Sequence, residues 1–162
     1  MLARHPFAYL ASFLLIFAGL YSLYHLSEPL LPAYYQALAS STCWVFGWFD
    51  QAVGCEANYI LYHGIRRLVV VEGCDGVTFF ILVLAAVLPF PAPWRHKWTG
   101  LAWMLPLIFM INWARLLVLT AIQFYATTYF DIFHVYFFQP LMIAFTLIFF
   151  MLWMLVADAK PA

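Results

Sequence analysis

The chain has 162 residues, of which 67% are hydrophobic and only 9% charged, and its formal net charge is zero. Water-soluble domains carry about 25% charged residues, so this composition excludes an ordinary soluble globular protein. The balanced charge, without a basic patch, also gives no reason to expect nucleic acid as a partner. The sequence therefore predicts an α-helical membrane protein that forms a single integral membrane domain over residues 1–162.

Four apolar stretches have the length and composition of membrane-spanning helices. They are residues 7–25, 76–90, 98–125 and 135–157. A helix needs about 20 apolar residues to cross the hydrocarbon core of a bilayer. The first stretch has no small-residue cleavage site after it, so we expect it to be a retained anchor rather than a signal peptide. The chain is thus expected to cross the membrane about four times.

The basic residues indicate the orientation of these spans. Four of them fall on one side of a four-span arrangement, namely Arg4, Arg95, Lys97 and Lys160. Only Arg66 and Arg67 fall on the other side. The positive-inside rule makes the first side cytoplasmic. We therefore expect a multi-pass protein of the cytoplasmic (inner) membrane, with residues 27–73 facing the periplasm or outside.

The outward segment combines two patterns. Aromatic and aliphatic residues recur at helical spacing across residues 33–53, which predicts an amphipathic helix. Two placements are open for this helix, on the surface of the outer leaflet or packed against the bundle. β-Branched and aromatic runs on either side of Gly64, within residues 58–71, predict a short β-hairpin. The hairpin would lead the chain into Cys74.

Three cysteines have different surroundings. Cys43 and Cys55 fall in the outward segment, where they either form a disulfide in an oxidising compartment or stay separate, with Cys43 buried in the helix. A disulfide would leave Cys74 as the odd, free thiol. Cys74 lies between Gly73 and Gly76, which permit backbone angles that other residues avoid and leave the sulfur open to an approaching chain. Cys74 is therefore a candidate nucleophile.

Polar residues near apolar runs add further candidates. Arg115 interrupts the third run, where a charge is costly and points to a functional site, and His134 stands at the start of the fourth. Asn112, three residues before Arg115 on the same helix face, would hold the guanidinium or join helices. Asp131, three residues before His134, would orient the imidazole or cap the helix. The bland alternative is that Arg115 forms a structural ion pair with Asp75 or Asp131.

Cys74, Arg115 and His134 are expected to lie on the same side of the membrane. Counting about 1.5 Å of rise per residue from the cytoplasmic ends places Arg115 level with Cys74 and His134 several residues higher. A tilted helix or a sunken outer funnel would close that gap, so we expect one outward-facing cavity. The three residue types would supply a nucleophile, an oxyanion-stabilising cation and a base, as acyl transfer requires.

Three sequence motifs in this order resemble the exosortase/archaeosortase family: Glu72-Gly73-Cys74-Asp75-Gly76-Val77, Asn112-Trp113-Ala114-Arg115 and Phe133-His134. The resemblance covers roughly residues 58–153, and Asp75 stands where the family most often has Ser. It implies a multipass membrane cysteine protease or transpeptidase with Cys74, Arg115 and His134 as catalytic residues. Asn112, Asp75 and Asp131 would support them.

The resemblance also implies the substrates. They would be exported proteins with a C-terminal motif, an apolar helix and a basic tail. Cys74 would form a thioester that water or an amine on a lipid or glycan resolves, and no cofactor or metal is expected. Two alternatives are a non-enzymatic membrane scaffold or assembly protein and, less favoured because the spans have few polar residues, a small transporter subunit with Arg115 in its pathway.

Overall fold

The computed structural model describes residues 6–27 and 31–158. Its elements, in order, are α1 (Pro6–Ser27), α2 (Pro32–Gly47), β1 (Val53–Glu56), β2 (Tyr59–Tyr62), β3 (Ile65–Val69), α3 (Val77–Val87), α4 (Trp94–Tyr125), the 3₁₀ helix η3 (Thr127–Tyr129), the π-helix η4 (Ile132–Phe138) and α5 (Gln139–Asp158). Arg4 and Lys160, which contribute to the predicted orientation, lie outside the described residues.

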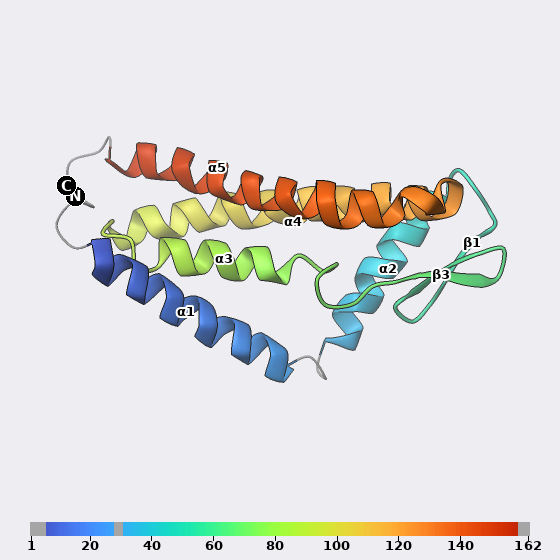
Figure 1. The fold of residues 1–162 in the computed structure, drawn as a ribbon, viewed down its shortest axis with the longest axis horizontal. Coiled ribbons are helices and arrows are strands. Elements are labelled where there is room, and N and C mark those ends of the chain that lie inside the picture. The colour runs from blue at the N-terminus through green and yellow to red at the C-terminus, as the bar shows by residue number, and fades with distance from the viewer. Residues whose placement is uncertain (1–5, 28–30, 159–162) are drawn as a thin grey trace.

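α3, α4 and α5 run lengthwise beside one another, and α1 runs obliquely to them (Figure 1). The start of α1, the turn between α3 and α4, and the end of α5 gather at one end, whereas α2 and the strands lie at the other. Among the described residues, three helical stretches are long and apolar enough to cross a membrane: α1, α4 and residues 127–156. α3 is equally apolar but has 11 residues. The predicted helical membrane fold is confirmed, with three full-length helices and a short fourth one.

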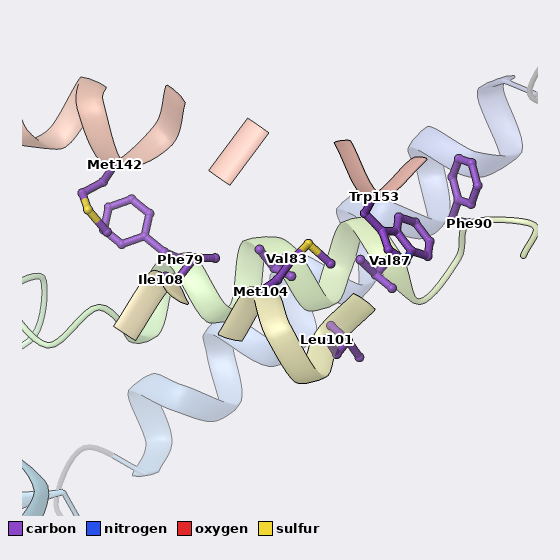
Figure 2. Close-up of a cluster of buried hydrophobic side chains, with 9 residues drawn as sticks. All are labelled: Phe79, Val83, Val87, Phe90, Leu101, Met104, Ile108, Met142 and Trp153. Atoms are coloured by element: carbon purple, nitrogen blue, oxygen red, sulfur yellow. The ribbon is translucent and has the colours of Figure 1, made fainter. Parts of the chain in front are cut away.

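The core of the bundle lies where α3, α4 and α5 meet (Figure 2). Val83 of α3 and Met104 of α4 are fully buried there. Gly100 lets α5 approach closely, because a Cβ at this position would lie 2.2 Å from the indole Nε1 of Trp153. That indole donates a hydrogen bond to the carbonyl of His96 at 3.0 Å.

A three-stranded antiparallel sheet, ordered β1-β2-β3, stands at the end of the bundle opposite the turn between α3 and α4. The sequence predicts that this end faces outward, and we call it the outer end. The predicted hairpin is its β2–β3 pair, and His63 and Gly64 at the turn have positive φ. The sequence analysis did not predict β1. This strand has four residues including Gly54, too few to show an alternating pattern.

α2 crosses the outer end of the bundle and packs on it with one face (Figure 1). Its buried Leu38 and Ala39 lie in a cluster with Ile60 of β2 and Leu116 of α4. The opposite face exposes Trp44, which is 62% exposed. The helix predicted over residues 33–53 is thus present and packs against the bundle, but it is shorter than predicted, because it ends at Gly47 and Val53 already belongs to β1.

A disulfide between Cys43 and Cys55 joins α2 to β1. This is one of the two arrangements left open by the sequence. The bond ties the helix to the sheet and leaves Cys74 as a free thiol.

The structure also moves boundaries of the predicted spans. The second span ends at Val87 rather than residue 90, because three prolines follow within six residues. α4 begins at Trp94, directly after Pro93, so Lys97 lies in its first turn and not in a loop. The Lys97 side chain is buried and donates to the carbonyl of Leu88. The fourth span begins at Ile132 as a π-helix, ahead of the predicted residue 135.

Candidate active site

Cys74 lies on the short loop between β3 and α3, and two glycines shape this loop. Gly73 and Gly76 have φ of +85° and +81°, which L side chains rarely adopt. The backbone N–H of Cys74 donates to the carbonyl of Val71 at 3.0 Å. Gly76 also lies directly against α4, because a Cβ there would be 2.8 Å from Cγ of Asn112. The glycines therefore allow the loop to turn tightly and press against α4.

Two buried polar side chains of α4 hold the loop. Asn112 Nδ2 donates to the carbonyl of Cys74 at 3.1 Å. Arg115 Nη1 donates to the carbonyl of Gly73 and to Asn112 Oδ1, each at 3.3 Å. Asn112 thus contacts the guanidinium as predicted, and both residues also contact the main chain at the thiol.

Part of the Arg115 guanidinium has no partner. Arg115 is 3% exposed, and its Nε and Nη2 atoms are buried without a hydrogen-bond acceptor among the described residues. Within residues 6–27 and 31–158, no carboxylate forms an ion pair with it. The structural pair with Asp75 or Asp131, considered from the sequence, is therefore not formed. The Nε–H and Nη2–H₂ donors of this buried guanidinium are therefore left without a protein acceptor among the described residues.

His134 approaches the loop from η4. Its Nε2 atom lies 3.9 Å from Cys74 Sγ. The sequence predicts His134 several residues above Cys74, a gap that a tilted helix or a sunken outer funnel would close. A π-helix, bonded from residue i to i+5, has more residues in each turn and rises less per residue, and such segments are frequent at functional sites. The π-helical backbone thereby reduces the predicted mismatch in height.

Asp131 is the one predicted site residue that the structure leaves apart. Its side chain is exposed and makes no capping hydrogen bond to η4. No hydrogen bond joins it to His134 in the described part of the chain. The suggested roles in orienting the imidazole or capping the helix have no contact to support them.

Asp75 is held by two tyrosines that the sequence analysis missed. Tyr24 of α1 donates its hydroxyl proton to Asp75 Oδ2 at 2.5 Å, and Tyr34 of α2 donates to the Asp75 carbonyl at 2.8 Å. The backbone N–H of Val77 donates to Oδ1 at 3.3 Å. Tyrosines near the end of a membrane helix are common as interfacial anchors, so no sequence pattern marked these two.

Burial dominates the protonation of the Cys74 thiol. Burial raises the pKa of this thiol, the Arg115 guanidinium works against the rise, and the Asp75 carboxylate adds to it. Cys74 is therefore a protonated thiol at neutral pH. The Arg115 guanidinium favours the thiolate, but the effect of burial on the pKa of this thiol is larger. Across the site from this protonated sulfur lies His134 Nε2, at 3.9 Å.

Burial also raises the pKa of the Asp75 carboxyl above its usual value, although the hydrogen bonds from Tyr24 and Val77 act in the opposite direction.

No group of three or more His, Cys, Asp or Glu side chains in the described residues is arranged to hold a metal ion.

The family profile described as transmembrane exosortase matches residues 2–155. The chain belongs to the transmembrane exosortase family. Exosortases are membrane-embedded cysteine transpeptidases that act on exported proteins. The family resemblance noted around Cys74, Arg115 and His134 is thereby confirmed. Neither a curated protein nor a solved structure matches the chain.

Proposed function

We propose that this exosortase cleaves the C-terminal sorting signal of exported proteins through a thioester on Cys74. One observation carries the proposal. The free thiol of Cys74 lies 3.9 Å from His134 Nε2, on a loop held by Arg115, whose buried guanidinium keeps two unpartnered nitrogens. A nucleophile, a base and a source of positive charge are the groups that peptide-bond cleavage needs.

His134 acts as the general base in the first step. Its neutral Nε2 accepts the proton of the Cys74 thiol while the sulfur attacks the carbonyl carbon of the scissile bond, forming a C–S bond. The separation of 3.9 Å is long for proton transfer. Catalytic hydrogen bonds are often long without substrate and shorten in the complex.

Arg115 stabilises the negative charge that develops on the carbonyl oxygen. Its Nε and Nη2 atoms are buried, and donors in a dry site are worth more than donors in water. Their fixed planar geometry suits an oxyanion better than a lysine ammonium would. The contacts of Nη1 with Gly73 and Asn112 hold the guanidinium in place before the substrate binds.

Collapse of the tetrahedral intermediate breaks the C–N bond. The imidazolium of His134 returns its proton to the leaving amine, which carries away the apolar helix and basic tail. The acyl group stays on Cys74 as a thioester. Attack by water would give hydrolysis, and attack by an amine of a lipid or glycan would give transpeptidation.

The site is proposed to face the outside of the cytoplasmic membrane. It lies at the end of the bundle that carries the sheet and the Cys43–Cys55 disulfide, which requires an oxidising compartment. The opposite end carries Arg95, as the positive-inside rule expects of a cytoplasmic turn. An impermeant maleimide should label a cysteine introduced at Arg67 but not one at Arg95 in intact Cys74→Ala cells. Labelling at position 95 but not at position 67 would show that the protein has the opposite orientation.

Mapping the C-termini of exported proteins tests the function. Cells carrying the native gene are compared by mass spectrometry with cells carrying Cys74→Ala. We expect the native cells to contain proteins cut just before an apolar helix, and the variant cells to accumulate the same proteins uncut. Identical C-termini in the two strains, with the variant present in the membrane at equal amount, would refute the function.

A further inference from the structure

Tyr24 supplies the shortest hydrogen bond to the buried carboxylate next to Cys74. Its hydroxyl lies 2.5 Å from Asp75 Oδ2, and the hydroxyl of Tyr35 lies 3.3 Å from the Tyr24 oxygen. Asp75 is 1% exposed and otherwise receives the N–H of Val77 at 3.3 Å. A buried carboxylate is tolerated only where donors satisfy it, and bonds to a charged acceptor are the stronger kind. Tyr24 is thus a main determinant of where Asp75 lies.

The same end of α1 also contacts Glu72, which precedes Cys74 in the loop. Tyr21, one turn before Tyr24, donates its hydroxyl proton to Glu72 Oε1 at 3.1 Å. His25 Nδ1 lies 3.5 Å from Glu72 Oε2. Glu72 precedes Gly73 and Cys74, and Asp75 follows them. α1 therefore contacts the chain on both sides of the thiol.

These contacts are not those of a helix that serves only as an anchor. Tyr24 is the single buried residue among the described side chains of α1. Interfacial tyrosines that anchor a helix place their hydroxyls among lipid headgroups, whereas Tyr24 is 6% exposed and turned onto a carboxylate. At the other end of α1, Tyr9 donates to the carbonyl of Ala86 at 2.9 Å, which joins α1 to α3. The two ends thus have separate roles.

We propose that α1 is a positioning element of the active site, in which Tyr24 acts through Asp75 to aim the Cys74 thiol at His134. The inference rests on the proposed acyl transfer, since it assigns Tyr24 a part in that reaction. Asn112 fixes the carbonyl of Cys74 from one side, and Tyr24 fixes the next residue from the other. With the Cys74 carbonyl and the Asp75 carboxylate both held, the sulfur has little freedom to turn away from the imidazole.

A double-mutant cycle on the full-length protein in membranes tests this positioning role. The variants are Tyr24→Phe, Asp75→Ala and the pair, with Asp75→Asn in place of Asp75→Ala if the latter lowers the folded yield. Tyr9→Phe is the matched control, because it removes a phenolic hydrogen bond of α1 at the far end. The measurements are kcat and KM for a substrate found by C-terminal mapping, the folded yield, and the alkylation rate of Cys74 by iodoacetamide.

We expect Tyr24→Phe to lower kcat by about 10- to 100-fold with little change in KM, because misplacement of a reacting group has effects of this size. The double variant should be no slower than Asp75→Ala alone, since residues acting through one contact are not additive. Tyr9→Phe should match the native protein. An unchanged kcat in Tyr24→Phe, or additive losses in the pair, would overturn the proposal.

Alkylation separates failure of this proposal from failure of the function, because it needs no substrate. If Cys74→Ala still cleaves, the proposed function is wrong. The positioning of the thiol by Tyr24 is then judged by alkylation alone. A several-fold altered rate in Tyr24→Phe but not in Tyr9→Phe supports it, and equal rates overturn it. If Cys74→Ala is inactive but Tyr24→Phe cleaves at the native rate, the function stands and the role of Tyr24 falls.

Discussion

Cys74 Sγ and His134 Nε2 lie 3.9 Å apart although 60 residues separate them in the chain. The thiol comes from the loop before α3, and the imidazole comes from the π-helical start of the last apolar stretch. Between them in sequence, α4 supplies Arg115, which bonds the residue before the thiol. Each of three separate segments thus contributes one group, and the outer ends of the bundle bring them together.

The Cys74 thiol should titrate above the ordinary range of cysteine, because burial raises its pKa. The rate at which iodoacetamide alkylates Cys74 in membranes should increase with pH. The inflection of this pH profile should lie above the ordinary range of cysteine. Asp75→Asn should move the inflection down by removing a neighbouring negative charge, and Arg115→Gln should move it up. An inflection below the ordinary thiol value would contradict the protonated resting state.

Replacing His134 should make the cleavage rate depend more steeply on pH, because hydroxide must then remove the proton of the Cys74 thiol. At neutral pH, His134→Ala should cleave about 10²- to 10⁴-fold more slowly, the usual contribution of a general base. The loss should shrink as pH rises toward the thiol pKa, because the sulfur then ionises without help. His134→Gln, which keeps the approximate size of the side chain, should behave alike. Initial cleavage rates across pH check this, and a deficit that does not change with pH would show that His134 is not the base.

Arg115→Lys should lose cleavage while the protein still accumulates. Removing an oxyanion donor typically costs about 10²- to 10³-fold in kcat, and the ammonium does not reproduce the planar donor geometry. The folded yield should hold, because no described carboxylate pairs with Arg115 and would be left unpaired in the interior. Cleavage rate and membrane yield are measured together. Normal cleavage, or a yield loss that accounts for the missing activity, would argue for a structural role.

Alanine substitutions at the two loop glycines should differ in severity. Each would place an L residue in a left-handed conformation, which costs about 1–2 kcal/mol. At Gly73 nothing lies within 4 Å of the added Cβ, whereas at Gly76 it would meet Asn112 at 2.8 Å. Gly76→Ala should therefore lower the melting temperature and the cleavage rate more than Gly73→Ala does. Equal effects would mean that the contact between the loop and Asn112 is not close.

The parts of the fold that the sequence predicts are those set by local physical requirements. Long apolar runs specify the helices, because a bilayer leaves few other structures. Gly64 between two β-branched runs specifies the hairpin. Cys74, Arg115 and His134 could be singled out because polar groups at or within apolar runs are costly without a role. Each of these signals is contained within a few neighbouring residues.

The parts that could not be predicted depend on distant contacts. The π-helical backbone around His134 is a hydrogen-bonding choice that side-chain patterns do not record. The buried state of Lys97 depends on the carbonyl of Leu88 across a proline-rich turn. The pairing of Tyr24 with Asp75 spans 51 residues, and a tyrosine near the end of an apolar helix looks like an interfacial anchor. Such contacts emerge only when the helices are packed.

The most direct test of the central claim is to capture the acyl group on Cys74. Membranes containing the enzyme are incubated with a substrate identified by C-terminal mapping, acid-quenched and analysed by peptide mass spectrometry. We expect the peptide that carries Cys74 to gain the mass of the upstream substrate fragment, and hydroxylamine to release it, as for a thioester. Cys74→Ala should show neither the adduct nor cleavage. Cleavage by Cys74→Ala, or an adduct on another residue, would contradict the account.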